Sequence, residues 1–574
     1  MTKTQKKNFK KKSFFFEDYT ESEIITNSTS LIKLSLNRTA FLFFVFISLM
    51  IIFCIKLIYL SLFPERDFIS GKINPSIINI RGDIIDRNGA ILARNIYIYS
   101  AGVMPQLITD KKKFLINLKI IFPNLDTKKI KKKLRRKNFF YIKKRLTDEE
   151  NTKLWLLGNK ALVLEKRQSR IYPQKNLFSH ILGQTDDSNK GISGIEKSFD
   201  HYLTKRKNTN SSLTLSLDAN LQYLIRKELV NAQNDFKSAG SAALLMNVNN
   251  GEILSLVSLP DYDLNKRTLI NNKKFTNKIT LGVYELGSVF KTFVVAAGLE
   301  NKIIKPNTVF KNLESQLRCD KYKINEHDKL PPNLSAEQIL IRSSNIGAVR
   351  IAQKVGIENY KKFLNTLGLF QKINFDLSEV GTPHKFRWGK CKLATASYGH
   401  GITTTPLQLA KAYSILGNGG YKIKPHIVKK ESNNKQRMTQ IISKKTSNEI
   451  NMILRKVVKL EEGTANFANI DGYYVGGKTG TALKYNSNER LNTFVSLFPA
   501  NRPQFVLLVM LDEPKSAPNF IYTFPPSEKF PNGFKHKGEK RNTAGWNTVV
   551  VAGKIIEKIG PILAINNLQA SKNF

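Results

Sequence analysis

Three short strings of polar residues have the composition needed for acyl transfer through a serine. The first is Ser288-Val-Phe-Lys291, the second is Ser343-Ser-Asn345 and the third is Lys478-Thr-Gly-Thr481. An activated serine attacks a carbonyl, a hydroxyl and an amide relay protons and orient a substrate, and a cation beside hydroxyls holds a carboxylate. The three strings therefore indicate an enzyme that forms an acyl-serine.

The first string lies where a buried helix is expected to begin. Gly287 marks a tight turn, and residues 289–297 are apolar enough for a buried helix. A serine and a lysine three positions apart share one helix face, and the hydroxyl lies in the positive field of the helix N-terminus. Lys291 can take the proton of Ser288 if burial and a second nearby cation lower the lysine pKa. Alone, this string also fits a helix cap beside a surface lysine.

The second string places two hydroxyls and an amide among apolar neighbours. Ser343 can pass a proton to a leaving group, and Asn345 can hold either a substrate amide or the lysine. The alternative is a solvated turn of serine and asparagine. The catalytic interpretation of this string therefore depends on the presence of the other two strings.

The third string is typical of a strand that a ligand approaches along its edge. Small residues stand on both sides of Lys478, so a ligand backbone can come close. The ammonium of Lys478 and the hydroxyls of Thr479 and Thr481 suit a carboxylate. We therefore expect a carboxylate-bearing substrate.

Two pairs of strands are predicted to flank a helical block. Alternating apolar runs at 242–248 and 252–258 enclose Asn249-Asn-Gly251, a turn whose residues tolerate positive φ. A second pair, at 492–498 and 504–511, follows the third string. Helices are expected between and after the pairs, at 287–299, 335–355, 406–416 and 549–565. These elements predict an α+β fold in which helices cover one antiparallel sheet.

A long apolar run near the N-terminus predicts a membrane anchor. Residues Ala40 to Phe63 read AFLFFVFISLMIIFCIKLIYLSLF, which as a helix crosses the roughly 30 Å of hydrocarbon in a bilayer. A cleaved signal peptide is the alternative, although the run is long for one and no A-x-A pattern follows it. Lysine and arginine gather before the run, so the positive-inside rule predicts a cytoplasmic tail at 1–38, an anchor at 39–63 and an outward-facing remainder.

The rest of the chain divides into two expected domains. Residues 64–210 combine short β-like pieces with charged helical pieces, which predicts an α+β module without catalytic strings. The domain that holds the three strings is expected at 211–567, and residues 568–574 are expected to form a short tail. With 574 residues, the chain is long enough for each domain to bury a hydrophobic core.

The chain is strongly basic, with 91 Lys and Arg against 45 Asp and Glu and a formal net charge of +46. Such a charge is typical of proteins that bind nucleic acid or an anionic surface. Here the excess is mostly lysine and runs over the whole length, so compositional bias with solvated faces explains it as well as an added attraction to acidic polymers or the membrane does. No nucleic-acid-binding motif is present, and no nucleic-acid partner is expected.

The three cysteines indicate neither a metal site nor a redox motif. None belongs to a C-x-x-C pair or has a histidine at ligand spacing, so we expect no metal and no other cofactor. Cys54 lies in the apolar run, which leaves Cys319 and Cys391 as the pair that an oxidising compartment would allow. Two ordinary buried thiols are an equally good interpretation.

Taken together, the three strings resemble the active-site motifs of the penicillin-binding protein and serine β-lactamase superfamily, Ser-x-x-Lys, Ser-x-Asn and Lys-Thr-Gly. The resemblance implies a transpeptidase domain in which Ser288 attacks the D-Ala-D-Ala end of a peptidoglycan stem peptide. D-Ala then leaves, and the amine of a neighbouring stem resolves the acyl-enzyme. β-lactams are expected to acylate the same serine.

The same resemblance implies a role for each residue. The expected catalytic residues are Ser288, Lys291, Ser343, Asn345 and Lys478, and the expected substrate-binding residues are Thr479, Gly480 and Thr481. Lys291 is the expected base and Ser343 the expected proton shuttle. The backbone N–H groups of Ser288 and Thr481 are the expected oxyanion hole.

Five further strings are similar to motifs of class B, the monofunctional penicillin-binding proteins. They are Arg81-Gly-Asp-Ile-Ile-Asp-Arg-Asn-Gly89 and residues 191–196, 260–265, 397–401 and 462–465. The resemblance covers nearly everything from Arg81 to the final helix, and it implies a non-catalytic pedestal module at 64–210. It argues against a β-lactamase and against a bifunctional enzyme with a glycosyltransferase domain. A non-catalytic division scaffold is the alternative from a different class.

Within class B, the chain is most similar to the septal, division-specific enzyme, and the cell-elongation paralogue is the alternative. The similarity rests on the length, the short tail, residues 397–401 and Thr543-Ala-Gly-Trp546. It implies an anchor in the bacterial inner membrane, a periplasmic catalytic domain, and a membrane-embedded glycan polymerase and other division proteins as partners. Residues 514–542 form a longer loop than the resemblance predicts.

Overall fold

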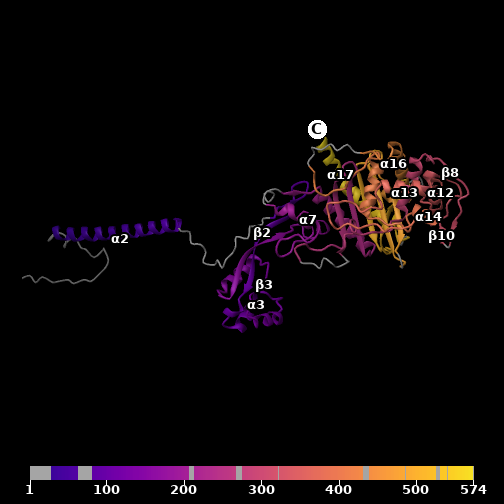
Figure 1. Ribbon diagram of the computed structural model, residues 1–574. Helices are drawn as coiled ribbons and strands as arrows, with labels where there is room; N and C mark the ends of the chain where they lie inside the picture. The colour runs from indigo at the N-terminus through magenta and orange to yellow at the C-terminus, as the bar shows by residue number, and fades with distance from the viewer. Residues whose placement is uncertain are drawn as a thin grey trace, which may run out of the picture. The chain divides into compact units, whose positions relative to one another are not determined.

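A computed structural model describes most of the chain (Figure 1). The described residues are 28–62, 81–205, 212–266, 275–320, 322–430, 439–484, 487–524, 530–538 and 541–572. The chain divides into two compact units, Met1–Ile78 and Asn79–Phe574, which are described separately. Predicted features at 1–27 and 63–80 lie outside the described residues.

The described part of the first unit is one helix, α2 (Ser28–Leu62). Within it, Ala40–Ile58 is long and apolar enough to cross a membrane, and its side chains are exposed. The predicted apolar helix is therefore present, and it begins about three turns before the predicted anchor. Helices of this kind are candidate membrane spans.

A long antiparallel strand pair forms the frame of the N-terminal module. β2 (Ile91–Val103) pairs with β4 (Leu162–Ile171), with Arg94 opposite Ile171 at one end and Val103 opposite Leu162 at the other. The remaining strands are β3 (Phe140–Lys143) and β1 (Ile84–Ile85), which pair with β2, and β5 (Leu213–Thr214), which joins β1 in parallel. Because β5 belongs to this sheet, residues just after 211 still contribute to the N-terminal module.

Three capped helices cover part of this sheet. They are α3 (Lys111–Ile121), α4 (Thr127–Leu134) and α5 (Asp148–Leu156), and the side chains of Asp110, Asp126 and Thr147 accept hydrogen bonds from their first turns. Such caps satisfy N–H groups that have no partner inside the helix. Apolar residues on the inner sides of these helices, including Phe114, Leu118 and Leu154, form a core of their own with β2. The lysines of α4 remain mostly on its outer side.

A buried ion network closes the start of this module. The Arg81 guanidinium donates to Glu196 Oε2 at 2.5 Å and to Asp200 Oδ1 at 2.6 Å. Arg170 Nε donates to the other Glu196 oxygen at 2.7 Å. Glu196 lies on α7 (Gly194–Ser198) and Asp200 on α8 (Asp200–Thr204), which follow α6 (Ser179–Leu182). Two cations and two carboxylates balance, as burial of charge requires, so the Arg81-Gly-Asp string holds these short helices to the sheet.

The second sheet joins the two predicted hairpins. Its strands are β6 (Gly240–Asn247), β7 (Ile253–Leu259), β12 (Gly476–Leu483), β13 (Arg490–Phe498) and β14 (Phe505–Asp512). Their order is β12-β13-β14-β6-β7, and every neighbouring pair is antiparallel. The predicted antiparallel sheet is thus confirmed, with β12 and its Lys478 at one edge.

Two groups of helices cover this sheet (Figure 1). One group is α9 (Ala219–Asp235) and α17 (Thr548–Lys572), and the other is α15 (Pro406–Gly417) and α16 (Lys444–Lys459), with α10 (Lys291–Glu300) packed against α16. The α+β fold class predicted from the sequence is confirmed. Helix α17 runs through Lys572 and so includes most of the residues expected to form a tail.

The helix predicted at 335–355 is interrupted at the second string. α11 (Ala336–Ile341) ends before Ser343, and α12 (Asn345–Val355) begins after it. Ser343 has a φ of 59°, a left-handed conformation that few residues other than glycine adopt. Two further helices, α13 (Ile357–Thr366) and α14 (Lys390–Ser397), pack against α12.

The longer loop at 514–542 contains a short hairpin of β15 (Ile521–Phe524) and β16 (Phe534–Lys537). The rings of Phe524 and Phe534 stack with centroids 4.2 Å apart. Phe524 also lies 4.9 Å from the Phe467 ring and 6.0 Å from Trp546. Aromatic packing therefore holds this hairpin beside the 3-10 turns η5 (Asn466–Ala468) and η6 (Ala544–Trp546).

Candidate active site

Ser288 lies in a tight turn pressed against the third string. The 3-10 turn η4 (Gly287–Phe290) leads directly into α10, as the sequence predicted. Gly287 has a φ of 64°, and a Cβ there would lie 2.7 Å from the carbonyl oxygen of Thr481. A Cβ on Gly480 would lie 2.2 Å from the Leu286 carbonyl oxygen. Two glycines thus allow the serine turn and β12 to make backbone contact.

Lys291, Ser343 and Lys478 meet in the interior. Lys291 Nζ donates to the Ser343 carbonyl oxygen at 2.5 Å and lies 3.1 Å from Ser343 Oγ. Lys478 Nζ lies 2.9 Å from the same Oγ. Both lysine side chains are fully buried. Because two amines point at Ser343 Oγ as donors, the hydroxyl proton of Ser343 is free to be donated elsewhere.

Burial changes the charge state of both lysines. It lowers the pKa of Lys291 to about 7, a shift that the carboxylate of Glu326 partly opposes. Burial and the neighbouring charge of Lys291 lower the pKa of Lys478 well below its ordinary value. An amine that is neutral near pH 7 can accept a proton, so these conditions suit a lysine base.

Ser288 belongs to the same site but is not locked into it. Its side chain is partly exposed, whereas its neighbours Gly287 and Val289 are buried. Within the described part of the chain, no hydrogen bond ties its hydroxyl to Lys291 or Lys478. Catalytic hydrogen bonds often tighten only when substrate is bound.

Asn345 is held by its amide and leaves its oxygen unused. Its Nδ2 donates to the Asn325 carbonyl oxygen at 2.8 Å. Its Oδ1 is buried and has no hydrogen-bond partner among the described residues. A buried acceptor without a partner is costly unless a ligand satisfies it. Of the two roles predicted for this residue, the arrangement fits contact with a substrate amide better than contact with Lys291.

Residues beside the motifs complete the site, and the sequence did not single out their roles. Thr464 and Thr479 share a hydrogen bond between their hydroxyls at 2.9 Å. Thr481 Oγ1 accepts from the backbone N–H of Ala544 at 3.1 Å. Ala544 lies in the string Thr543-Ala-Gly-Trp546, and Thr464 lies in the string at 462–465. Two of the weaker sequence strings thus position the threonines of β12.

The string at 397–401 lies against the serine turn. A Cβ on Gly399 would come within 2.0 Å of the Gly287 carbonyl oxygen. His400 Nδ1 lies 3.2 Å from Glu285, just before that turn, and its ring is parallel to that of Tyr398. The hydrogen bond to Glu285 raises the pKa of His400. This string therefore shapes the wall beside Ser288.

The geometry excludes a phosphate-binding loop at the third string and decides between the two interpretations of the cysteines. Residues Gly472 to Thr479 have the spacing of a phosphate-binding P-loop, but Lys478 lies within strand β12 and not at the start of a helix, where a P-loop needs it. Cys319 and Cys391 form a disulfide with Cα atoms 5.6 Å apart, so the oxidised pair is the correct interpretation. Among the described residues, the one metal-like cluster contains these two sulfurs, which the bond removes as thiolate ligands.

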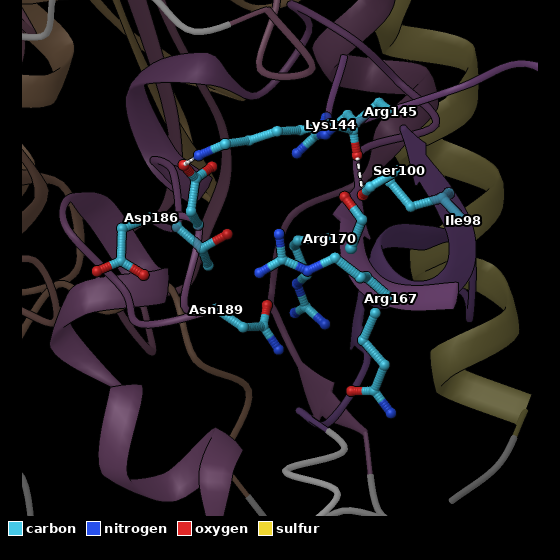
Figure 2. Close-up of a pocket in the computed structure, with 12 residues that line it drawn as sticks. Ile98, Ser100, Lys144, Arg145, Arg167, Arg170, Asp186 and Asn189 are labelled. Carbon is cyan, nitrogen blue, oxygen red and sulfur yellow. Dashed lines mark hydrogen bonds and ion pairs between the residues drawn. The ribbon is translucent and has the colours of Figure 1, made fainter. Parts of the chain in front are cut away.

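The polar hollow in Figure 2 belongs to the N-terminal module. Its lining includes Lys144, Arg145, Arg167 and Arg170, and Lys144 forms an ion pair with Asp187. None of the residues of the three catalytic strings contributes to it. The hollow is therefore distinct from the candidate active site.

The chain matches two family models. The model described as the penicillin binding protein transpeptidase domain matches residues 241–522. The model described as the penicillin-binding protein dimerisation domain matches residues 76–228. The first contains all three catalytic strings, and the second contains the buried network of Arg81.

Curated relatives and a solved structure agree with these matches. The probable peptidoglycan D,D-transpeptidase FtsI of Caulobacter vibrioides is 31% identical over 500 residues, which cover 84% of this chain and 82% of that protein. Stage V sporulation protein D of Bacillus subtilis is 30% identical over 494 residues, covering 77% and 75%. The penicillin-binding protein PBP2 of Helicobacter pylori, solved in complex with MreC, has the same fold, with a TM-score of 0.66 at 20% identity over 84% of this chain and 98% of that chain. With its dimerisation module, its transpeptidase domain and the three strings inside that domain, the chain belongs to the class B penicillin-binding proteins, a family of peptidoglycan D,D-transpeptidases.

Proposed function

We propose that this protein is a septal transpeptidase that cross-links peptidoglycan stem peptides through an acyl-enzyme on Ser288. The observation that carries the chemistry is the convergence of Lys291 and Lys478 on the Ser343 hydroxyl. Lys291 follows directly after the turn that holds Ser288. The name of the Caulobacter relative supports the septal role. Elongation is the second candidate, because one solved structure with this fold is a PBP2 in complex with MreC.

Acylation begins with a proton transfer from Ser288 Oγ to neutral Lys291. Burial supports this step, since it lowers the pKa of Lys291 to about 7. The oxygen attacks the carbonyl of the penultimate D-Ala, and the backbone N–H groups of Ser288 and Thr481 stabilise the oxyanion. The proton passes through Ser343 to the leaving nitrogen, and D-Ala departs. The free Oγ–H of Ser343, which two amines approach as donors, supports this relay.

Deacylation reverses the direction of the proton. The amine of a second stem peptide attacks the acyl-serine carbonyl and gives its proton to the same relay. Ser288 leaves as an alkoxide and is protonated by Lys291. The net reaction exchanges one amide for another and needs neither a metal nor a redox cofactor.

The edge of β12 is the proposed binding surface for the donor stem. Lys478, Thr479 and Thr481 hold the terminal carboxylate, Gly480 allows close approach of the backbone, and the unpartnered Oδ1 of Asn345 accepts a substrate N–H. β-lactams place their carboxylate and carbonyl on the same groups. Two hydroxyls and a buried amine are a suitable set for one carboxylate.

The proposed cellular arrangement follows from the anchor. Residues 39–63 span the inner membrane, the tail at 1–38 is cytoplasmic, and the catalytic domain at 211–567 is periplasmic. The module at 64–210 serves as a pedestal, and the anchor places the protein beside a membrane-embedded glycan polymerase and other division proteins. The PBP2 of Helicobacter pylori was solved bound to MreC, which supports protein partners for this fold.

The septal role is tested by depletion of the protein in its own cells. Septal function predicts filaments that elongate without dividing, with a fluorescent fusion at the division site. Rounded cells with label along the side wall would favour the elongation role instead.

A further inference from the structure

One carboxylate outside the family strings reaches the candidate active site. Glu326 follows a hairpin of β9 (Gln316–Cys319) and β10 (Tyr322–Asn325). Its Oε1 accepts from Ser344 Oγ at 2.6 Å and from the Ile346 N–H at 2.9 Å, and its Oε2 accepts from the Asn345 N–H at 2.8 Å. Both oxygens are therefore used at the N-terminus of α12.

These bonds hold the second catalytic string in place. The start of a helix has N–H groups without partners and a partial positive charge, and a carboxylate satisfies both. Asn325, the residue before Glu326, fixes the Asn345 side chain through its carbonyl oxygen at 2.8 Å. Glu326 and its neighbour thus position Asn345 directly and Ser343 through the adjoining backbone.

The hairpin that carries Glu326 is itself firmly held. The disulfide between Cys319 and Cys391 joins β9 to α14. Ile324 is 3% exposed and packs with Ile346, Val349 and Ala394 in a small core between the hairpin, α12 and α14. The carboxylate of Glu326 therefore follows a hairpin that is packed and linked by a disulfide, and it does not lie on a free loop.

We propose that Glu326 is a positioning residue for acyl transfer: it fixes Ser343 and Asn345 through the start of α12, and with Ser343 the two oxygens that hold Lys291 Nζ. This inference rests on the proposed acyl-transfer function. Among the residues that the structure describes, the charged or titratable groups that interact electrostatically with Lys291 are Glu326 from the hairpin, Lys478 from β12, and His327, whose pKa burial and Lys291 both lower. Glu326 is the group among them that favours the protonated amine.

A purely structural cap and a charge-setting residue make different predictions for pH dependence. A cap alone changes the acylation rate equally at every pH. Loss of the Glu326 charge lowers the pKa of Lys291 further, because the carboxylate opposes the effect of burial. The neutral base then persists to more acidic pH, and the acidic limb of the rate profile moves to lower pH.

The test measures the rate of acylation of the full-length protein in detergent by a fluorescent penicillin from pH 5 to pH 9. Glu326→Gln is expected to be about tenfold slower at high pH, because a charged acceptor is lost at the helix start, and to have its acidic limb at lower pH. Glu326→Asp keeps the charge on a shorter side chain. We therefore expect a slower acylation rate, with the acidic limb of the pH–rate profile at the same pH as in the wild type. Glu314→Gln removes an exposed carboxylate from the segment just before β9 and is expected to match the wild type.

Thermal unfolding of each variant checks that the protein folds. A Glu326→Gln protein that folds and keeps both the wild-type rate and the wild-type limb would overturn the inference. A slower rate with an unmoved limb would reduce Glu326 to a cap and contradict its effect on Lys291. Failure of the wild-type protein to be acylated at Ser288 would instead contradict the proposed function, so the two failures are distinguishable.

Discussion

The Nζ atoms of Lys291 and Lys478 approach the same oxygen, Ser343 Oγ, at 3.1 and 2.9 Å. Both amines are fully buried, and two ammonium groups this close in a dry site repel each other strongly. The arrangement therefore disfavours the state in which both lysines carry a charge. A neutral Lys291 is the form that can take the proton of Ser288.

Replacement of Lys291 tests its role as the base. We expect Lys291→Arg to lower the acylation rate by about 10²- to 10⁴-fold, because a guanidinium stays protonated and cannot accept the proton of Ser288. Covalent labelling by a fluorescent penicillin measures the rate. Lys362→Arg, an exposed lysine on α13, is the matched control and should label normally. Wild-type labelling of the Lys291→Arg protein would remove this lysine from the mechanism.

The pH dependence of the wild-type protein follows from the lowered pKa of Lys291. The base must be neutral to act, so acylation should be fast above about pH 7 and should slow as the pH falls through that value and Lys291 gains a proton. An ordinary lysine would place this limb about three units higher. Stopped-flow acylation rates across pH locate the limb, and a limb above pH 9 would contradict a buried lysine base.

Lys478 is expected to act on binding rather than on the nucleophile. We expect Lys478→Ala to weaken capture of a penicillin about 10- to 100-fold while the maximal acylation rate changes less, since loss of a charge-assisted contact costs about 1.5 to 3 kcal/mol. Saturation kinetics with a carboxylate-bearing penicillin separate the two quantities. An unchanged half-saturation concentration would contradict carboxylate capture by this residue.

Gly287 is predicted to be intolerant of any side chain. Gly287→Ala should lower both the thermal midpoint and the acylation rate, because the new Cβ would lie 2.7 Å from the Thr481 carbonyl oxygen and force η4 away from β12. Gly472→Ala is the control: Gly472 also has positive φ, but no atom lies within 4 Å of the added Cβ, so its backbone strain of about 1 to 2 kcal/mol is measured alone. Equal effects of the two variants would contradict the close backbone contact.

The buried network of Arg81 is predicted to stabilise the N-terminal module. Arg81→Ala leaves the buried carboxylate of Glu196 short of one of its two partners and should cost about 3 to 5 kcal/mol of unfolding free energy. Arg94→Ala breaks a solvent-exposed pair with Asp83 and should lower the thermal midpoint far less. Thermal unfolding compares the two. Similar midpoints would contradict a structural role for the Arg81 string.

Much of the fold could be predicted because short stretches of sequence indicate its helices and strands. Apolar alternation around Asn249-Asn-Gly251 and at 492–511 predicts the strands of the central sheet. The order of the three strings also predicted that they form one site. These patterns involve residues close in sequence, so they can be recognised without knowledge of tertiary contacts.

The rest depends on contacts between residues distant in sequence. The left-handed backbone of Ser343 is imposed by the break between α11 and α12, and serine itself gives no sign of it. Glu326 looks like any solvated carboxylate in a charged segment, yet the fold places it at the start of α12. The sequence spacing is compatible with a disulfide between Cys319 and Cys391, but it does not distinguish a disulfide from two free thiols.

The central claim is that Ser288 is the acylated nucleophile. Full-length wild-type protein and Ser288→Ala, both shown to be folded by thermal unfolding, are incubated with a penicillin for hours and digested for peptide mass mapping. The account predicts one stable penicilloyl adduct on the wild-type peptide that contains Ser288 and none on the variant. An adduct on another residue, equal labelling of the variant, or a wild-type adduct that disappears within minutes as in a β-lactamase would contradict it.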